Sequence, residues 1–521
     1  MTHIPGTDSL RDVNILAMVR IIGVLLVWTA VAMLPPLLLS IREGDWVAWL
    51  AAVSVTTVIG LAMWLRTPGQ GAIDRRGGLV VVGLGWLAIV SVGSLPFLFT
   101  GTAPSVIGAI FESVSGFTTT GATIFSSVEA LPRSILMWRS ISHWLGGMGI
   151  IVLGVAILPF VGVGGAQLFH AEAPGISGDR LTPRIASTAR LLWGVYAALT
   201  GTLFLIYLVL GMSAFDAVNH AMSALATGGF STKTASMAAF SPAIQWVTIV
   251  FMLIAGTNFA LHYRMVAQGG TAWFKDLEWQ VYVGMAIGAS AICFVALMAQ
   301  AEREVGQSIN EVLRHAVFNV TAVISTTGFA TADFAQWPSV CLVVLIGLMF
   351  MGAMGGSTGG GFKVVRVVVL AKQTLGEFQR VLHPQAVIVT RLGRRTVRPD
   401  VVLKVVGLFA LYVVTHGAGT VFLAALGYDF VTSASAALAA MSSIGPGLGL
   451  VGPASHYGDL HPAALAVLTA LMLLGRLEFY TLLILFIPDT WRVTRRRPDH
   501  GKRDLPGARN GPARAKNGPV R

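Results

Sequence analysis

The stretch STTGFATADF, residues 325–334, places a serine, three threonines and a glycine within seven positions of an otherwise strongly apolar chain. Three similar strings occur elsewhere, namely TTTGATIF (118–125), ATGGFSTK (226–233) and SSIGPGLG (442–449). Each string follows an apolar segment of about 10 to 16 residues, which is too short to cross roughly 30 Å of hydrocarbon as a helix. These segments cover residues 106–117, 214–226, 309–324 and 432–441. The pattern predicts four re-entrant helices, each ending in a polar string.

The composition is that of a membrane protein. The chain has 521 residues, of which 55% are hydrophobic and 12% are charged, and its mean hydropathy is +0.73. Such values exclude a soluble protein of this length. Ten further apolar segments are long enough to span a bilayer, and the first of them is too long for a cleaved signal peptide. They cover residues 15–39, 46–65, 78–99, 134–161, 190–211, 243–265, 279–299, 338–372, 402–426 and 462–487.

The order helix, re-entrant helix, string, helix occurs four times. Taking Gly121, Gly228, Gly328 and Gly445 as the key glycines, the intervals are 107, 100 and 117 residues. Such repetition indicates one structural unit used four times. Non-helical backbone at membrane depth is tolerated only where protein buries it or where it lines a wet cavity. We therefore expect an all-α polytopic membrane protein with four pseudo-symmetric repeats around one central pore, preceded by two extra transmembrane helices.

The expected boundaries follow from this order. Residues 1–70 hold the two extra helices, and the four repeats occupy 71–165, 166–267, 268–375 and 376–490. The second and fourth repeats begin with cytoplasmic loops, and residues 491–521 form a basic, disordered tail.

Positive charge gathers on one side of this predicted topology. The formal charge is +12, and residues 491–521 hold ten Lys or Arg against two Asp. The loop 363–400 holds eight Lys or Arg against two acids. Because basic residues are retained in the cytoplasm, we expect both termini there and the strings to open outward. The basic tail suits anionic lipid better than nucleic acid, and a solvated tail without a partner is the alternative.

The strings have the chemistry of a binding site for a monovalent cation. An extended backbone that includes positive φ angles, which glycine adopts without steric cost, can aim successive carbonyl oxygens into a central hole. Four such strings would replace the water shell of an ion such as K+, and the short helices would point their negative ends at it. A single string is explained equally well as a turn between helices, but four at regular spacing favour a filter. The expected ligands are Thr119, Thr120, Gly121, Ala226, Thr227, Gly228, Thr326, Thr327, Gly328, Ser443, Ile444 and Gly445.

A second glycine-rich stretch, MGAMGGSTGGG (351–361), interrupts the apolar segment 338–372. Each interior glycine costs a helix about 0.5 to 1 kcal/mol, so a break is expected. We interpret it as an intramembrane gate loop, with close helix packing through small residues as the alternative. Arg476, placed near the middle of the last span, is expected to face the pore and repel cations, or else to form a salt bridge between helices. The gate residues are Gly355, Gly356, Ser357, Thr358, Gly359, Gly360, Gly361 and Arg476.

Other polar residues in the membrane carry weaker signals. Glu112 and Asn319 are expected to brace the strings rather than bind the ion. His143, His220, His262 and His416 are expected to pack or hydrogen-bond, and Cys293 and Cys341 to act as small buried apolar residues.

Other classes of function fit the sequence less well. HExxH and Walker motifs are absent, which argues against an enzyme and against an organic cofactor. A secondary transporter coupling K+ to H+ or Na+ is the main alternative, because broken helices also form transporter sites. The scarcity of carboxylates in the apolar segments disfavours a proton relay.

Several motifs together resemble the TrkH/KtrB family of bacterial potassium-uptake proteins, the TrkH branch most of all. They are FESVSGFTTTGATI (111–124), HWLGGMGIIVL (143–153), AEAPGISGDRLTPRI (171–185), STTGFATADF, GGSTGGGFKVVR (355–366) and GRLEFYTLL (475–483). The resemblance implies K+ permeation through a four-repeat filter and a homodimer in the bacterial inner membrane. It also implies a cytosolic nucleotide-binding ring of the TrkA/KtrA type. Two positions depart from the family pattern, since Ser443 stands where Asn is usual and Ala226 where a hydroxyl is usual.

Overall fold

The computed structural model describes residues 15–67, 75–156, 181–268, 270–301, 308–393 and 395–491. Almost all regular structure in these ranges is helical, and their one sheet is a hairpin of two short strands, β1 (Arg391–Leu392) and β2 (Arg395–Thr396). The predicted all-α class is confirmed. The predicted basic tail beyond residue 491, the first 14 residues and much of the motif 171–185 lie outside the described residues.

The N-terminal part consists of α1 (Ile15–Ala32), α2 (Leu34–Glu43) and α3 (Trp46–Leu65). Helices α1 and α3 pack closely because both carry a glycine at the contact: a Cβ on Gly23 would lie 2.7 Å from the Gly60 carbonyl oxygen. The predicted first span, 15–39, is therefore two helices. It breaks at Met33, where prolines in the first turn of α2 lack the amide that would continue α1.

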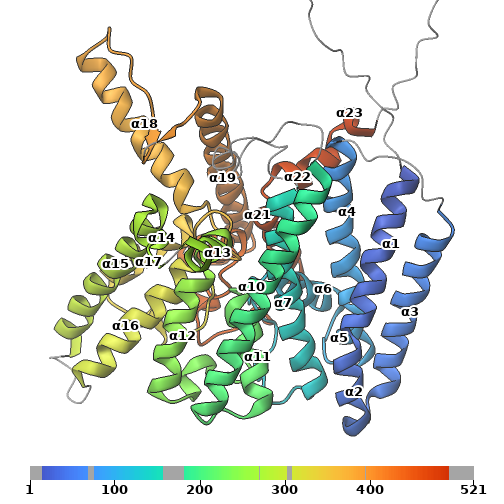
Figure 1. Ribbon diagram of the computed structural model, residues 1–521. Helices are drawn as coiled ribbons and strands as arrows, with labels where there is room; N and C mark the ends of the chain where they lie inside the picture. The colour runs from blue at the N-terminus through green and yellow to red at the C-terminus, as the bar shows by residue number, and fades with distance from the viewer. Residues whose placement is uncertain are drawn as a thin grey trace, which may run out of the picture.

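Four repeats follow, each with a long helix, a short helix, a string and a second long segment (Figure 1). The first repeat contains α4 (Arg75–Gly93), α5 (Leu95–Phe99), α6 (Val106–Phe117) and α7 (Arg133–Ala156). The second contains α10 (Leu181–Val209), α11 (Ala214–Leu225), η1 (Ser236–Ala239), α12 (Pro242–Ala255) and α13 (Phe259–Gln268). The third contains α14 (Ala272–Lys275), α15 (Leu277–Ala301), α16 (Ile309–Ile324), η2 (Phe334–Gln336), α17 (Ser339–Met351) and α18 (Val364–Leu382). The fourth contains α19 (Pro399–Ala425), α20 (Phe430–Ser442), η3 (Gly449–Val451), α21 (Pro462–Arg476), α22 (Tyr480–Leu483), η4 (Ile484–Phe486) and α23 (Pro488–Trp491).

The four short helices begin in the same way. Each has an N-cap residue whose side-chain oxygen accepts a hydrogen bond from the amide three positions on, which satisfies one of the free donors at a helix start. The N-cap residues are Ser105 for α6, Ser213 for α11, Ser308 for α16 and Asp429 for α20. The caps explain why the four predicted re-entrant segments agree with the observed helices to within two residues at each end.

Two predicted spans are not continuous helices. Helices α12 and α13 are bent by 100° relative to each other, and α21 and α22 by 110°. The prediction of unbroken helices over 243–265 and 462–487 was therefore wrong. At the first break, the Gly256 carbonyl accepts a hydrogen bond from the Met354 amide at 3.1 Å, so a distant loop takes the place of the next helical turn. At the second, Glu478 and Phe479 have φ angles of 56° and 51°, outside the helical range.

Length and composition identify six helices in the described residues that can each cross a membrane, or up to eight if each bent pair counts as one span. The ten predicted spans all fall on helices, but several of these helices are broken or carry polar residues. The predicted segment 338–372 is α17, a loop and α18, and α18 continues to Leu382. The chain is a polytopic membrane protein.

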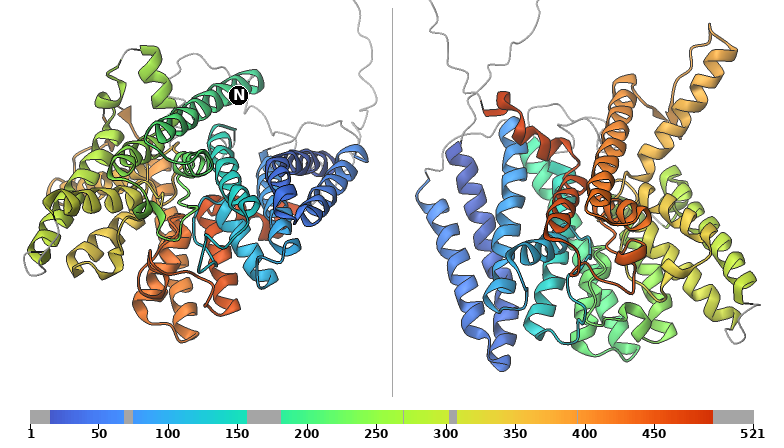
Figure 2. Two further views of the ribbon diagram at one scale, coloured as in Figure 1. Left: turned by 90° about the horizontal axis from the view of Figure 1, so that it is seen from below. Right: turned by 180° about the vertical axis from the view of Figure 1, so that it is seen from behind.

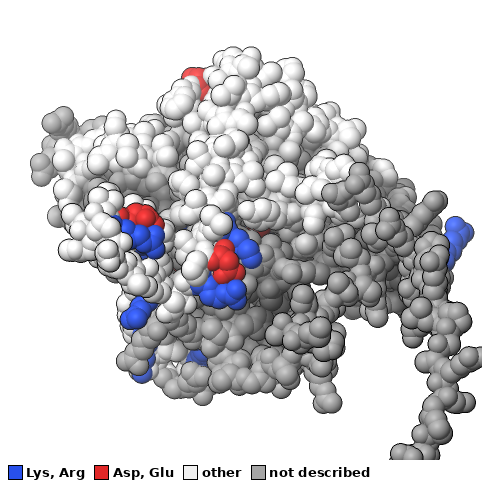
Figure 3. All heavy atoms as spheres, turned by 90° about the horizontal axis from the view of Figure 1, so that it is seen from above, with Lys and Arg blue, Asp and Glu red and all other residues white. Residues whose placement is uncertain are grey.

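Both ends of the described chain lie on one side of the molecule. The start of α1, helix α23 and the protruding tips of α18 and α19 share this side (Figures 1 and 2). A view of this side shows charged side chains in a few groups among uncharged ones (Figure 3). The exposed Arg380–Glu377 pair belongs to α18, and the exposed Arg398–Asp400 pair lies at the start of α19.

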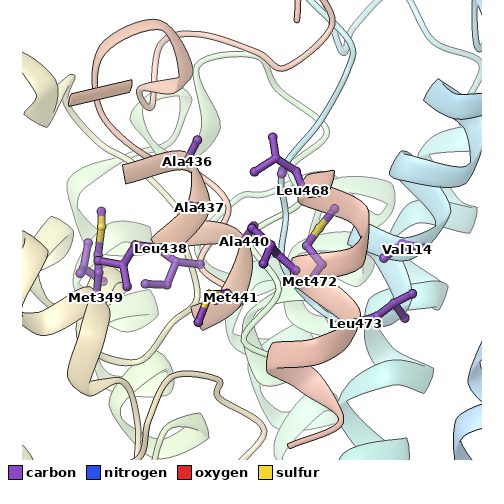
Figure 4. Close-up of a cluster of buried hydrophobic side chains, with 14 of the residues drawn as sticks. Val114, Met349, Ala436, Ala437, Leu438, Ala440, Met441, Leu468, Met472 and Leu473 are labelled. Carbon is purple, nitrogen blue, oxygen red and sulfur yellow. The ribbon is translucent and has the colours of Figure 1, made fainter. Parts of the chain in front are cut away.

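The apolar core is densest where α20 lies between its neighbours. Ala437 and Ala440 of α20 are almost fully buried, and Met472 of α21 and Met349 of α17 lie on either side of this helix (Figure 4). Small side chains on α20 let α21 approach closely, which is how helices associate in lipid. The approach is closest at Gly475, where a Cβ would lie well inside 3.0 Å of the Met441 carbonyl oxygen.

Replacing Gly475 by Ala is expected to lower the melting temperature of the detergent-purified protein, because overpacking a helix contact costs about 1 to 3 kcal/mol. The matched control is Gly288→Ala in α15, where an added Cβ meets nothing within 4 Å. That change should leave the melting temperature unchanged or raise it slightly. Equal effects of the two changes would contradict the tight α20–α21 contact.

Candidate functional site

The four strings meet around a common centre. One glycine in each string lies very close to a carbonyl oxygen of the next string. This carbonyl belongs to the residue that precedes the corresponding glycine there, and a Cβ on the first glycine would collide with it or press against it. The contacts close a ring, from Gly121 to Gly228, from Gly229 to Thr327, from Gly328 to Ile444 and from Gly445 to Thr120. The first string therefore touches both the second and the fourth, as an arrangement around one axis requires.

The ring identifies Gly229, not Gly228, as the equivalent glycine of the second repeat. The residue two positions before each of the four ring glycines has a positive φ angle. The amide of the next residue donates a hydrogen bond to the carbonyl oxygen five residues earlier, in the short helix of the same repeat. The positive-φ residues are Thr119 at 54°, Thr227 at 52°, Thr326 at 57° and Ser443 at 54°. The amides are those of Thr120, Gly228, Thr327 and Ile444, with N···O distances of 2.9, 2.8, 2.8 and 3.0 Å.

The predicted second set, Ala226, Thr227 and Gly228, is thus one residue early, and the equivalent set is Thr227, Gly228 and Gly229. Ala226 instead caps the end of α11, as Thr118 caps the end of α6. Two adjacent glycines gave the sequence two possible registers. The predicted end of the short helix at residue 226 does not separate them, because the residue four positions later is Phe230.

The backbone of the strings leaves its carbonyl oxygens without donors. Because the amides turn back into the short helices, the carbonyls point away from those helices. The carbonyl oxygens of residues 119–121, 227–229, 326–328 and 443–444 accept no hydrogen bond from any described residue. Most of these residues are fully buried. Buried carbonyls normally have a partner, so this ring requires water or a cation.

The electrostatics of the site favour a cation. Helices α6, α11, α16 and α20 all end at the strings, so the negative ends of four helix dipoles point to the same place. Neutral carbonyl and hydroxyl oxygens match a monovalent ion, whereas divalent ions usually need carboxylates. No group of three or more potential metal-ligating His, Cys, Asp or Glu side chains exists in the described residues.

Side chains of the short helices brace the strings from behind. The amide three positions after the ring glycine bonds to Glu112 at 3.0 Å in the first repeat, to Asn319 at 3.2 Å in the third and to Ser435 at 2.8 Å in the fourth. In the second repeat, His220 Nε2 bonds to the Ser231 hydroxyl at 2.9 Å. The contacts of Glu112 and Asn319 match the predicted bracing arrangement. Ser435 and this contact of His220 were not predicted, because the bracing residue differs in type from one short helix to the next.

Glu112 is also half of a buried ion pair. Arg139 Nε of α7 lies 2.8 Å from Glu112 Oε1, and the same guanidinium stacks 3.9 Å from the centre of the Phe230 ring. Arg139 Nη1 donates to the Ser231 carbonyl at 3.2 Å. This arginine therefore joins the first two repeats directly behind their strings.

A hollow opens on the outer side of the ring. Its lining includes Gly121, Gly229, Gly328 and Gly445 together with the loops that follow the strings. At its edge, the Thr234 amide donates to Glu129 at 2.9 Å, and the Thr234 hydroxyl also donates to this carboxylate. Partial burial alone would raise the pKa of Glu129, but the hydrogen bonds from Thr234 outweigh it and lower this pKa below its usual range.

The predicted break in the segment 338–372 is a loop from Gly352 to Lys363, hereafter the inner loop. Gly352, Gly356 and Gly361 have φ angles of 70°, 77° and 77°. Glycine is needed at these positions because other residues rarely adopt such angles. The alternative of small residues packing within a continuous helix is therefore wrong.

The inner loop lies against the ends of three short helices. The Thr358 hydroxyl is 3.0 Å from the Leu225 carbonyl oxygen at the end of α11. The Gly360 amide donates to the Thr326 hydroxyl at 2.6 Å, and a Cβ on Gly360 would collide with the Ser442 carbonyl. The loop thus covers the strings on the side opposite to the outer hollow.

Arg476 holds this loop. It is the last residue of α21, rather than lying near the middle of a span as predicted, and it is 3% exposed. Its Nη1 donates to the Thr358 carbonyl at 2.7 Å and its Nη2 to the Gly146 carbonyl at 3.4 Å. No acidic side chain among the described residues lies within 4.0 Å of it, so the predicted alternative of an interhelical salt bridge is not observed.

Other charged groups hold the rest of the loop. Glu278 at the start of α15 accepts hydrogen bonds from the Gly355 amide at 2.7 Å and the Val365 amide at 3.1 Å, so one carboxylate ties both arms of the loop together. Lys363 donates to the Gly359 carbonyl, and Glu478 pairs with Arg366. Glu278 was missed in the sequence because it lies about 77 residues from the amide it binds.

Comparison with known proteins identifies this arrangement. The model of the TrkH family, described as cation transport protein, matches residues 48–492. The chain belongs to the TrkH family of cation transport proteins. The family is one of transporters, so the predicted membership and the predicted non-enzymatic role in transport are both confirmed.

Individual relatives cover almost the whole chain. The Trk system potassium uptake protein TrkH of Halomonas elongata is 40% identical over 480 residues, covering 91% of this chain and 98% of that protein. Its namesake from Escherichia coli K12 is 38% identical over 483 residues, covering 91% and 99%. The crystal structure of the potassium transporter TrkH from Vibrio parahaemolyticus superposes with a TM-score of 0.84 at 38% identity, covering 92% of this chain and 100% of that one.

The corrected register of this TrkH-family protein can be tested at its two adjacent glycines. A Cβ on Gly228 would collide with the His143 side chain, whereas a Cβ on Gly229 would collide with the Thr327 backbone at a φ of 82°. Both Gly228→Ala and Gly229→Ala are expected to lower cation flux into proteoliposomes by roughly tenfold or more, the scale of a few kcal/mol of strain. A second change, His143→Ala, should restore flux in the Gly228→Ala variant but not in the Gly229→Ala variant. Rescue of Gly229→Ala instead would show that the register is wrong.

Proposed function

We propose that this protein takes up K+ by selective permeation through the ring of carbonyl oxygens. The single observation that carries the proposal is the closed ring of four strings whose buried carbonyls, apart from that of Gly445, accept no hydrogen bond from the described residues. Carbonyl rings of this kind replace the hydration shell of K+. The names of the relatives, potassium uptake proteins, agree with this substrate. The filter residues are those of the predicted set, with Gly229 added and Ala226 removed.

In this proposal the inner loop is the gate. It covers the inner side of the strings, and Arg476 adds a fixed positive charge next to it. A cation leaving the filter would meet both. The loop must therefore move for ions to pass, and the contacts of Arg476, Lys363 and Glu278 set the free energy of that movement.

We propose further that the protein sits in the bacterial inner membrane with both termini cytoplasmic, as a homodimer regulated by a cytosolic nucleotide-binding ring. The side that carries the start of α1 and helix α23 also carries the tips of α18 and α19, with the basic residues between them in sequence. Retention of basic loops in the cytoplasm supports that orientation. The projecting α18 exposes Leu375, Phe378 and Val381, which gives a partner an apolar surface to cover.

The decisive experiment is a measurement of permeability ratios for K+, Rb+, Na+ and Li+ with the purified protein in planar bilayers. K+ and Rb+ currents well above those of Na+ and Li+ are expected. A lack of discrimination would defeat the proposal. A K+ reversal potential that also shifts with pH or with the Na+ gradient would favour the coupled transporter.

Replacing Gly328 by Ser is expected to lower the K+ over Na+ permeability ratio, because the side chain would collide with the Ile444 carbonyl and displace a ring oxygen. Gly427→Ser is the matched control. Gly427 also has positive φ, at 95°, but an added Cβ there meets nothing within 4 Å. If both variants kept the wild-type ratio, Gly328 would have no part in selection.

Replacing Arg476 by Ala is expected to raise the rate of Rb+ uptake into proteoliposomes by roughly tenfold. Loss of a hydrogen bond from a charged donor is worth about 1.5 to 3 kcal/mol, which shifts the loop toward the open state. Arg398→Ala, a change at the exposed arginine just before α19, should leave uptake unchanged. Unaltered or slower uptake by Arg476→Ala would argue against a role in gating.

A further inference from the structure

The fourth string differs from the others at its glycine carbonyl. The Tyr457 hydroxyl donates a hydrogen bond to the Gly445 carbonyl oxygen at 2.7 Å. The equivalent carbonyls of Gly121, Gly229 and Gly328 accept no hydrogen bond from the described residues. From this contrast we infer that Tyr457 is a specificity-determining residue, which sets the position and strength of one oxygen of the outermost carbonyl ring. The inference rests on the proposed function.

Tyr457 is held firmly in place. It lies in the loop between η3 and α21 and is 3% exposed. Its amide donates to the Thr123 carbonyl of the first repeat at 2.8 Å, and its ring packs 5.4 Å from the ring of Phe111. The next residue, Gly458, approaches the Ile124 carbonyl so closely that a Cβ would collide. The first repeat thus positions the hydroxyl that binds the fourth.

The fourth string needs this support because it lacks an internal one. In the first string, Thr118 and Thr120 join their hydroxyls at 2.8 Å. In the third, Ser325 and Thr327 do the same at 2.8 Å. In the fourth string, the residue equivalent to Thr120 and Thr327 is Ile444, which has no hydroxyl, so this hydroxyl pair cannot form. The second string lacks it too, but there the His143 ring packs directly on Gly228.

The hydrogen bond changes the ring in two ways. It fixes the oxygen, so the ring cannot shrink easily around a cation smaller than K+. It also places the positive end of the hydroxyl dipole beside the ion, which weakens this ligand relative to the other three. Both the number and the field strength of ring oxygens govern the choice between K+ and Na+.

The test is Tyr457→Phe in the full-length protein, reconstituted in bilayers. Phenylalanine keeps the ring against Phe111 and removes only the donor. The K+ over Na+ permeability ratio is expected to fall by about three- to tenfold, the scale of one hydrogen bond. K+ flux should persist. Restoring the internal pair with Ile444→Thr in the same chain should recover part of the ratio.

The matched control is Tyr207→Phe. The Tyr207 side chain is also buried and loses one hydrogen bond, to the Thr248 hydroxyl at 2.7 Å, between α10 and α12. Its permeability ratio should equal that of the wild type. An unchanged ratio in Tyr457→Phe would overturn the inference, as would a loss of folded protein in this variant alone, since Tyr457 would then be only structural. A wild type that does not select K+ would instead defeat the proposed function.

Discussion

The architecture depends on one constraint, which is that backbone carbonyls at membrane depth must have partners. A single repeat cannot meet this constraint, because the string after its short helix directs amides back to that helix and leaves its carbonyls pointing away from it, without partners. Four repeats satisfy it together only if the strings face a common centre and something there binds the carbonyls. The glycines follow from this requirement. At Gly121, Gly229, Gly328 and Gly445 the chain needs positive φ and has no room for a side chain.

The inner loop obeys the same constraint in a different way. Its backbone is also irregular and buried, but many of its polar groups have a protein partner: Glu278 binds the Gly355 amide, Arg476 the Thr358 carbonyl and Thr326 the Gly360 amide. Met354 and Phe362 pack into the apolar core near the two ends of the loop, but the part between them is held by hydrogen bonds and charges, which can be exchanged for water at moderate cost. The carbonyls of the strings, apart from that of Gly445, have no such partners among the described residues. In the proposed function, the ring is therefore the static part of the path and the loop is the movable part.

How far the sequence predicts this structure depends on the range of the interactions. The short helices were predicted closely because their signals are local: a capping Ser or Asp at one end and a glycine string at the other. The break in the segment 338–372 was predicted because glycine is a poor helix former. The breaks after α12 and α21 were missed because they depend on distant partners, such as the Gly256–Met354 hydrogen bond. The predicted register of the second string was wrong for a related reason, because it is the contact with Thr327, a residue of another repeat, that distinguishes Gly229 from Gly228.

Fourfold similarity of the backbone does not make the four repeats chemically equal. The residue of the short helix that braces the string is a glutamate paired with arginine in the first repeat, a histidine in the second, an asparagine in the third and, one position earlier in its helix, a serine in the fourth. Because one chain encodes all four, each can change without the others. A ring built from four identical subunits would change all its ligands at once. In a single chain, selectivity can be adjusted one oxygen at a time, and the fourth string, with Ile444 and its hydrogen bond from Tyr457, is where this ring departs furthest from symmetry.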